Sequence, residues 1–129
     1  MSKIPSELRY TRTHEWVKVD GDKVIVGITD YAQSELGDVV FVELPSEGDD
    51  FEAGSEIATI ESVKGVSEIY APADGVVVEV NEELENVPEL INEDPYKDGW
   101  VYTFKVEDMS VLEDLLTADE YEAVIKKEE

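Results

Sequence analysis

Residues 55–71 read SEIATIESVKGVSEIYA, and Lys64 is the only basic residue among them. Two runs rich in strand-forming side chains, 55–61 and 66–71, flank the short segment 62–65. Such runs favour strands, and a glycine directly after the lysine favours a tight turn between them. This stretch therefore predicts a β-hairpin with Lys64 at its tip.

The rest of the chain predicts further short strands joined by turns. Alternating or β-branched runs indicate strands at 15–19, 23–28, 39–44, 76–80 and 100–106. Between them, the acidic segments 20–22 and 47–50 are typical of turns. These acidic segments lack the twelve-residue ligand spacing of a calcium loop, so we expect no metal site in them.

Helical segments are fewer and short. They are expected at 30–36, at 87–91, and at the C-terminus after capping-box motifs that start at Ser110 and Thr117. For the first of them, Thr29 or Asp30 is the predicted N-cap, and Gly37 is placed to end the helix.

The size and charge of the chain limit its function. It has 129 residues, 42% of them hydrophobic, and 10 Lys and Arg against 33 Asp and Glu give a net charge of −23. This charge disfavours binding to nucleic acids and anionic membranes. The longest apolar run, 39–42, is far too short to span a membrane, and the first residues show no targeting pattern. We expect a cytoplasmic monomer with one domain, 1–129, whose core covers about 10–106 and whose C-terminal helices cover about 110–127.

Few residues could carry out catalysis. The chain has no cysteine and one histidine, His14, which excludes thiol chemistry and paired-histidine metal sites. It also lacks the Gly-x-Ser-x-Gly motif that presents a serine nucleophile in many hydrolases. We therefore expect no catalytic residue and no metal, and a structural role for His14 near Trp16.

Lys64 stands out because of its isolation. In the 73 residues from Val24 to Tyr96 it is the only basic side chain, against nineteen acidic ones. An amine at a hairpin tip is accessible to a modifying enzyme, as a swinging-arm carrier requires. A Schiff-base enzyme would instead need a buried, neutral amine, whereas a tip among carboxylates favours the ammonium form.

The surroundings of Lys64 resemble the lipoylation site of glycine cleavage system H proteins. The motif is 61–64, ESVK, with Ser67 downstream; biotin carriers usually have methionine on both sides of the lysine, where this chain has Val63 and Gly65. Further matching segments, in the same order and spacing from about Tyr10 onward, are 13–17, 27–33, 36–45, 90–92 and 95–100.

This resemblance implies a mostly β fold, the barrel-sandwich hybrid of lipoyl and biotinyl carriers, and a protein that is not itself an enzyme. Lipoate would be attached to Lys64 as an amide by a lipoate-attaching enzyme. A pyridoxal-phosphate glycine decarboxylase would load an aminomethyl group, and a folate-dependent aminomethyltransferase would remove its one-carbon unit and ammonia. A dihydrolipoyl dehydrogenase would then reoxidise the dithiol.

The resemblance also implies a cleft that shelters the loaded arm. By motif matching, Glu15 is the carboxylate that would meet the aminomethyl amine, with Thr13 and Glu68 as further contacts. Thr13 stands where serine is also common, Glu68 where aspartate is usual, and Gly65 where alanine is more frequent. The simpler alternative for Glu15 is a strand carboxylate that faces water.

Two possible functions are consistent with the Lys64 motif. One is the glycine cleavage carrier, and the alternative is a similar lipoyl carrier that serves lipoate transfer or another sulfur pathway. Aminomethyl transfer with a purified decarboxylase would distinguish them.

Overall fold

Two antiparallel β-sheets form the centre of the protein, and the computed structural model describes residues 3–128. The larger sheet has six strands in the order β1 (Arg9–Tyr10), β2 (Glu15–Asp20), β3 (Lys23–Ile28), β9 (Tyr102–Val106), β8 (Gly75–Val80) and β5 (Asp50–Phe51). The smaller sheet has three, in the order β4 (Val39–Glu43), β6 (Glu56–Ser62) and β7 (Gly65–Tyr70). The predicted mostly β fold is confirmed.

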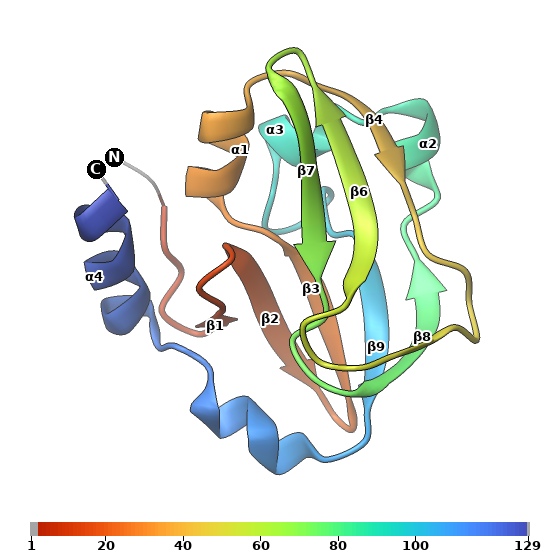
Figure 1. Ribbon diagram of the computed structural model, residues 1–129, viewed down its shortest axis with the longest axis vertical. Coiled ribbons are helices and arrows are strands. Elements are labelled where there is room, and N and C mark those ends of the chain that lie inside the picture. The colour runs from red at the N-terminus through yellow and green to blue at the C-terminus, as the bar shows by residue number, and fades with distance from the viewer. Residues whose placement is uncertain (1–2, 129) are drawn as a thin grey trace.

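Five short helical segments surround the sheets. They are α1 (Asp30–Leu36), α2 (Glu83–Asn86), α3 (Leu90–Glu93), the 3₁₀ helix η1 (Met109–Asp114) and α4 (Ala118–Glu128). Figure 1 shows the β6–β7 hairpin at the upper end of the molecule beside α1, with η1 at the opposite end and α4 along one side. None of the helices among residues 3–128 is long and apolar enough to cross a membrane.

The two sheets share one hydrophobic core. Alternate residues of β3 and β9, such as Val24 and Phe104, are buried together with Ile60 of β6 and Ile69 of β7. A second cluster lies between β1, β2, α1 and α4, where the rings of Tyr10 and Tyr121 stack with centroids 4.8 Å apart. Removing these apolar surfaces from water is the main stabilising contribution to the fold.

Most of the predicted elements are present, and some boundaries were wrong. The helix over 30–36 is confirmed, with the Thr29 side chain accepting a hydrogen bond from the Ala32 amide. The predicted strand at 100–106 begins only at Tyr102. The helical turn expected at 87–91 is replaced by two turns, α2 and α3, on either side of Val87 and Pro88.

The two capping boxes had different outcomes. The Thr117 box is confirmed: the Thr117 amide donates to the Glu120 carboxylate at 2.9 Å, and the Glu120 amide donates to Thr117 Oγ1 at 3.3 Å. The Ser110 box is wrong, because Asp108 is the cap and accepts hydrogen bonds from the Ser110 amide and hydroxyl. The segment that follows it is a 3₁₀ helix rather than an α-helix.

Candidate functional site

Lys64 lies at the tip of the β6–β7 hairpin, as predicted. Ser62 pairs with Gly65 across the two strands, so Val63 and Lys64 form the turn. The Ser62 hydroxyl accepts a hydrogen bond from the Lys64 amide at 3.2 Å and donates one to the Gly65 carbonyl at 3.3 Å. Gly65 has a φ of +150°, an angle that side chains rarely adopt.

The amine of Lys64 is accessible. Its side chain is exposed, and within residues 3–128 it takes part in no ion pair. A primary amine in this position can be reached by an enzyme and joined to a carboxylic acid as an amide. The site therefore fits a covalently attached acyl cofactor.

The hairpin tip is held against the end of α1. The Val63 amide donates to the Asp38 carbonyl at 3.0 Å. A β-carbon placed on Gly37 would lie 3.5 Å from Lys64 Cε and 3.4 Å from Val63 Cγ2. Gly37 and the stem of Lys64 are thus neighbours at the end of the helix.

A pocket of about 260 Å³ lies next to this end of α1. Leu36, the residue before Gly37, is one of its lining residues. Its walls come from the start of β2, from α1, from β6 and β7, and from the end of α4. The three side chains predicted for the cleft, Thr13, Glu15 and Glu68, all line it. Lys64 itself is not among the lining residues.

Glu15 is the buried charge of this pocket. Its side chain is 1% exposed, which excludes the alternative of a strand carboxylate facing water. It accepts hydrogen bonds from the hydroxyls of Thr11 and Thr13, and from the Tyr70 amide at 3.1 Å. Burial raises the pKa of the Glu15 carboxyl above its ordinary value, and the hydrogen bonds oppose this shift.

Thr13 and Glu68 are held differently. Thr13 is exposed, and its hydroxyl donates to Glu15. Glu68 is partly buried, and its carboxylate accepts a hydrogen bond at 2.8 Å from Thr59, its cross-strand partner. The structure thus joins Thr13 directly to Glu15, whereas Glu68 is bound to Thr59.

His14 and Glu128 complete the pocket on the side of α4. His14 has a φ of +73°, and its ring nitrogens bond the Tyr121 hydroxyl at 2.7 Å and the Glu128 carboxylate at 3.0 Å. The ring packs against Tyr31 and Tyr121, and not against Trp16 as we expected. No local pattern could have revealed the contacts with Tyr121 and Glu128, because each joins residues more than a hundred positions apart.

Ser67 is a further lining residue. It belongs to the motif around Lys64, but the sequence did not assign it to the cleft. Glu68, the next residue in β7, lines the pocket as well. Strand alternation would place the two on opposite faces, so it gives no signal that could have found Ser67.

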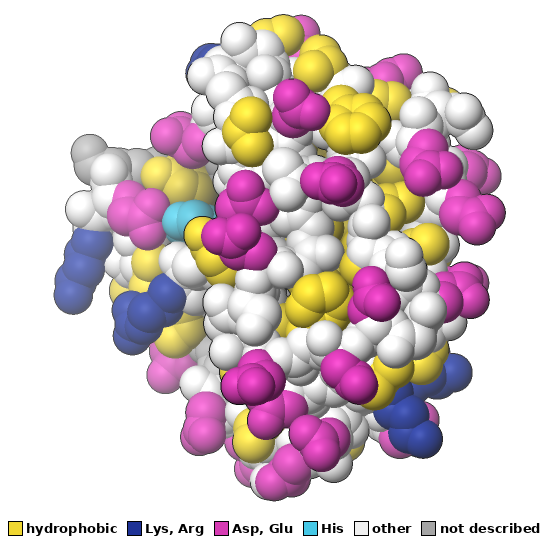
Figure 2. Space-filling view, turned by 45° about the vertical axis from the view of Figure 1, so that its right-hand side comes forward, with side chains coloured by type: hydrophobic (Ala, Val, Ile, Leu, Met, Phe, Trp, Pro, Cys, Tyr) yellow, Lys and Arg dark blue, Asp and Glu magenta, His cyan; other side chains and the backbone are white. Residues whose placement is uncertain are grey.

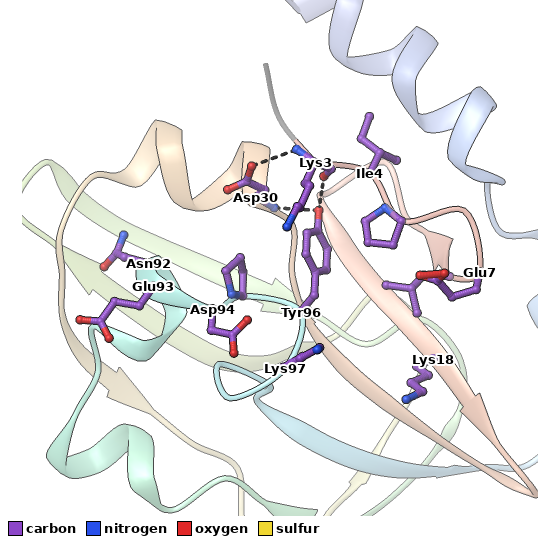
Figure 3. Close-up of a pocket in the computed structure, with 13 residues that line it drawn as sticks. Lys3, Ile4, Glu7, Lys18, Asp30, Asn92, Glu93, Asp94, Tyr96 and Lys97 are labelled. Atoms are coloured by element: carbon purple, nitrogen blue, oxygen red, sulfur yellow. Dashed lines mark hydrogen bonds between the residues drawn. The ribbon is translucent and has the colours of Figure 1, made fainter.

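A larger pocket, of about 770 Å³, lies away from these residues (Figure 3). It separates the N-terminal segment from the loop 92–97. On one side, the Tyr96 hydroxyl donates to the Lys3 carbonyl at 2.6 Å and accepts from the Asp30 amide at 3.0 Å. Lys64 and Glu15 are absent from its lining, so this pocket is not part of the candidate site.

Comparison with known proteins agrees with this geometry. The family model "Glycine cleavage H-protein" matches residues 8–128. The "Glycine cleavage system H protein" of Halalkalibacterium halodurans is 57% identical over 128 residues, covering 99% of this chain and all of the relative. That of Staphylococcus carnosus is 57% identical over 122 residues, covering 95% of this chain and 97% of the relative.

A solved structure is similar over nearly the same length. The crystal structure of a glycine cleavage system H protein from Mycobacterium marinum superposes with a TM-score of 0.82 at 42% identity. The match covers 93% of this chain and 97% of that chain. The chain therefore belongs to the glycine cleavage H-protein family.

Proposed function

We propose that this protein is the lipoyl carrier of a glycine cleavage system, with lipoate joined to Lys64. It would receive an aminomethyl group at the glycine decarboxylase, deliver it to the aminomethyltransferase, and be reoxidised by the dihydrolipoyl dehydrogenase. Lipoate supplies the sulfur chemistry that the chain, without cysteine, lacks. The observation that carries the proposal is the exposed amine of Lys64 at a hairpin tip, next to a pocket with a buried carboxylate.

The role of Lys64 is to provide the attachment nitrogen. The hairpin presents this nitrogen outward, and the stem of Lys64 lies beside Gly37 at the end of α1. Leu36, the preceding residue, lines the pocket. An arm attached at Lys64 could therefore follow α1 from the tip into the pocket.

The role of Glu15 is to hold a cation. Thr11, Thr13 and the Tyr70 amide fix its carboxylate, so little reorganisation is needed when an ammonium group arrives. A carboxylate and an ammonium form a charge-assisted hydrogen bond, which is stronger where water is excluded. Thr13 and Glu68 would add polar contacts at the edge of the pocket.

The pocket also limits access of water. The aminomethyl group is bound to sulfur and would be lost by hydrolysis in free solution. Burial of the group between α1, β2 and β7 would slow this loss, because an arm seated in a space of about 260 Å³ would leave little room for water. The protein would thus stabilise its cargo without catalysing a reaction on it.

Loading by a purified glycine decarboxylase tests this function. The lipoylated protein is incubated with the decarboxylase and glycine, and its intact mass is followed. We expect an aminomethyl increment on the wild type and none on Lys64→Arg. Glu15→Gln should still accept lipoate but release ammonia faster from the loaded arm.

The outcomes separate the alternatives. A lipoylated protein that the decarboxylase cannot load would contradict a role in glycine cleavage and favour another lipoyl-dependent pathway. An unchanged lifetime of the loaded arm in Glu15→Gln would remove Glu15 from the binding site.

A further inference from the structure

The exposed apolar side chains of the protein are concentrated around Lys64. Eight large hydrophobic residues are exposed in the part of the chain that the structure describes, and four of them lie beside the hairpin tip. These four, which we call the apolar collar, are Val40 (56% exposed), Phe41 (49%), Val63 (66%) and Val66 (62%). In Figure 2, yellow side chains with magenta ones between them mark this upper end of the molecule.

The backbone of β4 is irregular where it contributes to the collar. Its register with β6 shifts between Val39 and Phe41, so Val40 is an extra residue in the strand. Regular alternation would bury one of Val40 and Phe41, but both are exposed, while Val39 and Val42 on either side are buried. A β-bulge of this kind redirects side chains. Here it exposes two apolar groups, which is unfavourable in the isolated protein.

Strand pairing then aligns the collar across the small sheet. Phe41 pairs with Glu61, and Glu61 pairs with Val66, so the three side chains form one row on one face. Val63 extends the apolar surface to the turn that holds Lys64. A partner seated on this surface would contact two apolar side chains with a carboxylate between them.

The proximity of the collar to Lys64 indicates which partner it fits. An enzyme that forms the amide must place the activated carbonyl carbon of lipoate within bonding distance of Nζ. The free amine attacks that carbon, the C–N bond forms, the bond to the leaving AMP breaks, and nitrogen releases one proton. Exposed side chains beside Lys64, such as Val63 and Val66, therefore face the enzyme when this bond forms. An enzyme that acts on the sulfur end of the arm works several bonds away from Nζ.

We propose that the apolar collar is the docking surface for the lipoate-attaching enzyme, whose contact surface would be apolar with a basic group opposite Glu61. This inference rests on the proposed lipoylation of Lys64. The single carboxylate in the row would contribute to orientation, and the apolar contacts to affinity.

A lipoylation assay with matched variants tests the proposal. The apo-protein is incubated with lipoate, ATP and a purified lipoate–protein ligase, and modification is followed by intact mass. In Phe41→Thr/Val66→Thr, kcat/KM for attachment should fall about tenfold or more, as when the centre of an interface is altered. Val19→Thr is the matched control, because Val19 is 53% exposed on β2, in the other sheet. Its rate should stay within about twofold of the wild type.

Further measurements keep the test decisive. Threonine retains the β-branched shape that strands favour. If the double variant unfolds, Val63→Thr tests the same surface, because Val63 lies in the turn and in neither strand. Collar variants that are lipoylated like the wild type would overturn the inference while leaving the carrier function intact. A reduced loading by glycine decarboxylase without a reduced attachment rate would also overturn it. A wild-type protein that the ligase never modifies would contradict the proposed function itself.

Discussion

At the scale of single residues, Glu15, the first residue of β2, has a direct role in the proposed function. It is the only buried charged side chain in the part of the chain that the structure describes, and its oxygens are satisfied by two threonine hydroxyls and a backbone amide. Burial makes this carboxylate costly to ionise, and the donors offset part of that cost and hold the group in place to receive a cation. Burial of Glu15 thus both lowers the stability of the protein and strengthens the binding of a cation.

The raised pKa of Glu15 predicts a specific pH dependence of stability. Because burial raises its pKa above 4.5, the contribution of Glu15 to stability is greatest below that pH and is lost as pH rises through the folded-state pKa. Glu15→Gln has no such titration. Its free energy of unfolding relative to wild type should therefore increase with pH above 4.5, as measured by denaturant unfolding between pH 4 and about pH 8.

The same comparison has a built-in control. Glu61→Gln removes an exposed carboxylate, so its free energy of unfolding at neutral pH should stay within about 0.5 kcal/mol of wild type. A Glu15→Gln difference from wild type that does not change with pH would contradict the raised pKa of Glu15.

Two buried tyrosines provide a matched prediction about hydrogen bonds. The Tyr121 hydroxyl bonds His14 at 2.7 Å and Thr29 at 2.6 Å, whereas the buried Tyr102 hydroxyl has no hydrogen-bond partner among residues 3–128. Tyr121→Phe should lower the free energy of unfolding by about 1–3 kcal/mol, because it leaves buried polar atoms unsatisfied. Tyr102→Phe should leave it unchanged or raise it by up to about 1 kcal/mol.

Thermal and denaturant unfolding of both variants checks this pair. Equal losses in the two proteins would show that packing of the rings, and not hydrogen bonding, determines the effect.

At the scale of elements, the junction of α1 and β4 positions the hairpin tip. Gly37 ends α1 with a φ of +76° and a ψ of −157°, a region that is almost restricted to glycine. Its amide bonds the Gln33 carbonyl at 3.0 Å, and its free face lies under the Lys64 stem. Gly37 thus ends a helix directly beside the attachment site.

Gly37→Ala should therefore destabilise the protein. The strained backbone predicts a loss of about 1–3 kcal/mol in the free energy of unfolding. Glu35→Ala, an exposed change on the same helix, should stay within about 0.5 kcal/mol of wild type. Urea unfolding measures both, and a Gly37→Ala protein as stable as Glu35→Ala would contradict the assigned backbone conformation.

Local signals in the sequence predicted most of these elements. The β6–β7 hairpin, α1 and its Thr29 cap, and the Thr117 capping box all follow from residues close together in the chain. The two-residue strands β1 and β5 were not predicted, because only pairing with distant partners defines them. Pro88 lies between α2 and α3. The apolar residues around it suggested one helical turn over 87–91 and gave no sign of this interruption.

In the candidate site, too, local features were predicted and contacts between distant residues were not. The position of Lys64 at a tip followed from the turn chemistry of 62–65, and Glu15, Thr13 and Glu68 followed from the resemblance. The contribution of α4 could not be predicted, since His14 and Glu128 meet only in three dimensions. Exposure of both Val40 and Phe41 was equally hidden, because a bulge interrupts the alternation from which burial is inferred.

At the scale of the whole molecule, charge is the dominant property. Few close contacts offset the net charge of −23: among residues 3–128, Lys105 forms an ion pair with Asp22, and a His14 ring nitrogen lies 3.0 Å from the Glu128 carboxylate. Residues 1–23 hold five basic and four acidic side chains, so nearly all the excess lies beyond them. A carrier with such a surface would meet its partners through long-range attraction to basic surfaces.

This charge predicts that salt stabilises the protein. Raising NaCl from about 0.01 M to about 1 M shortens the screening length from about 30 Å to about 3 Å and weakens repulsion between carboxylates. The free energy of unfolding should rise over this range, and KCl should have the same effect as NaCl. Stability that is independent of salt would show that the carboxylates are too far apart to interact.

The central claim is that Lys64 carries lipoate, and the intact mass of the protein from cells that make lipoate, followed by peptide mapping, tests it most directly. We predict a single lipoyl or octanoyl increment, located on Lys64 and abolished in Lys64→Arg. A protein without the increment, or with the increment on another of its lysines, would contradict the account.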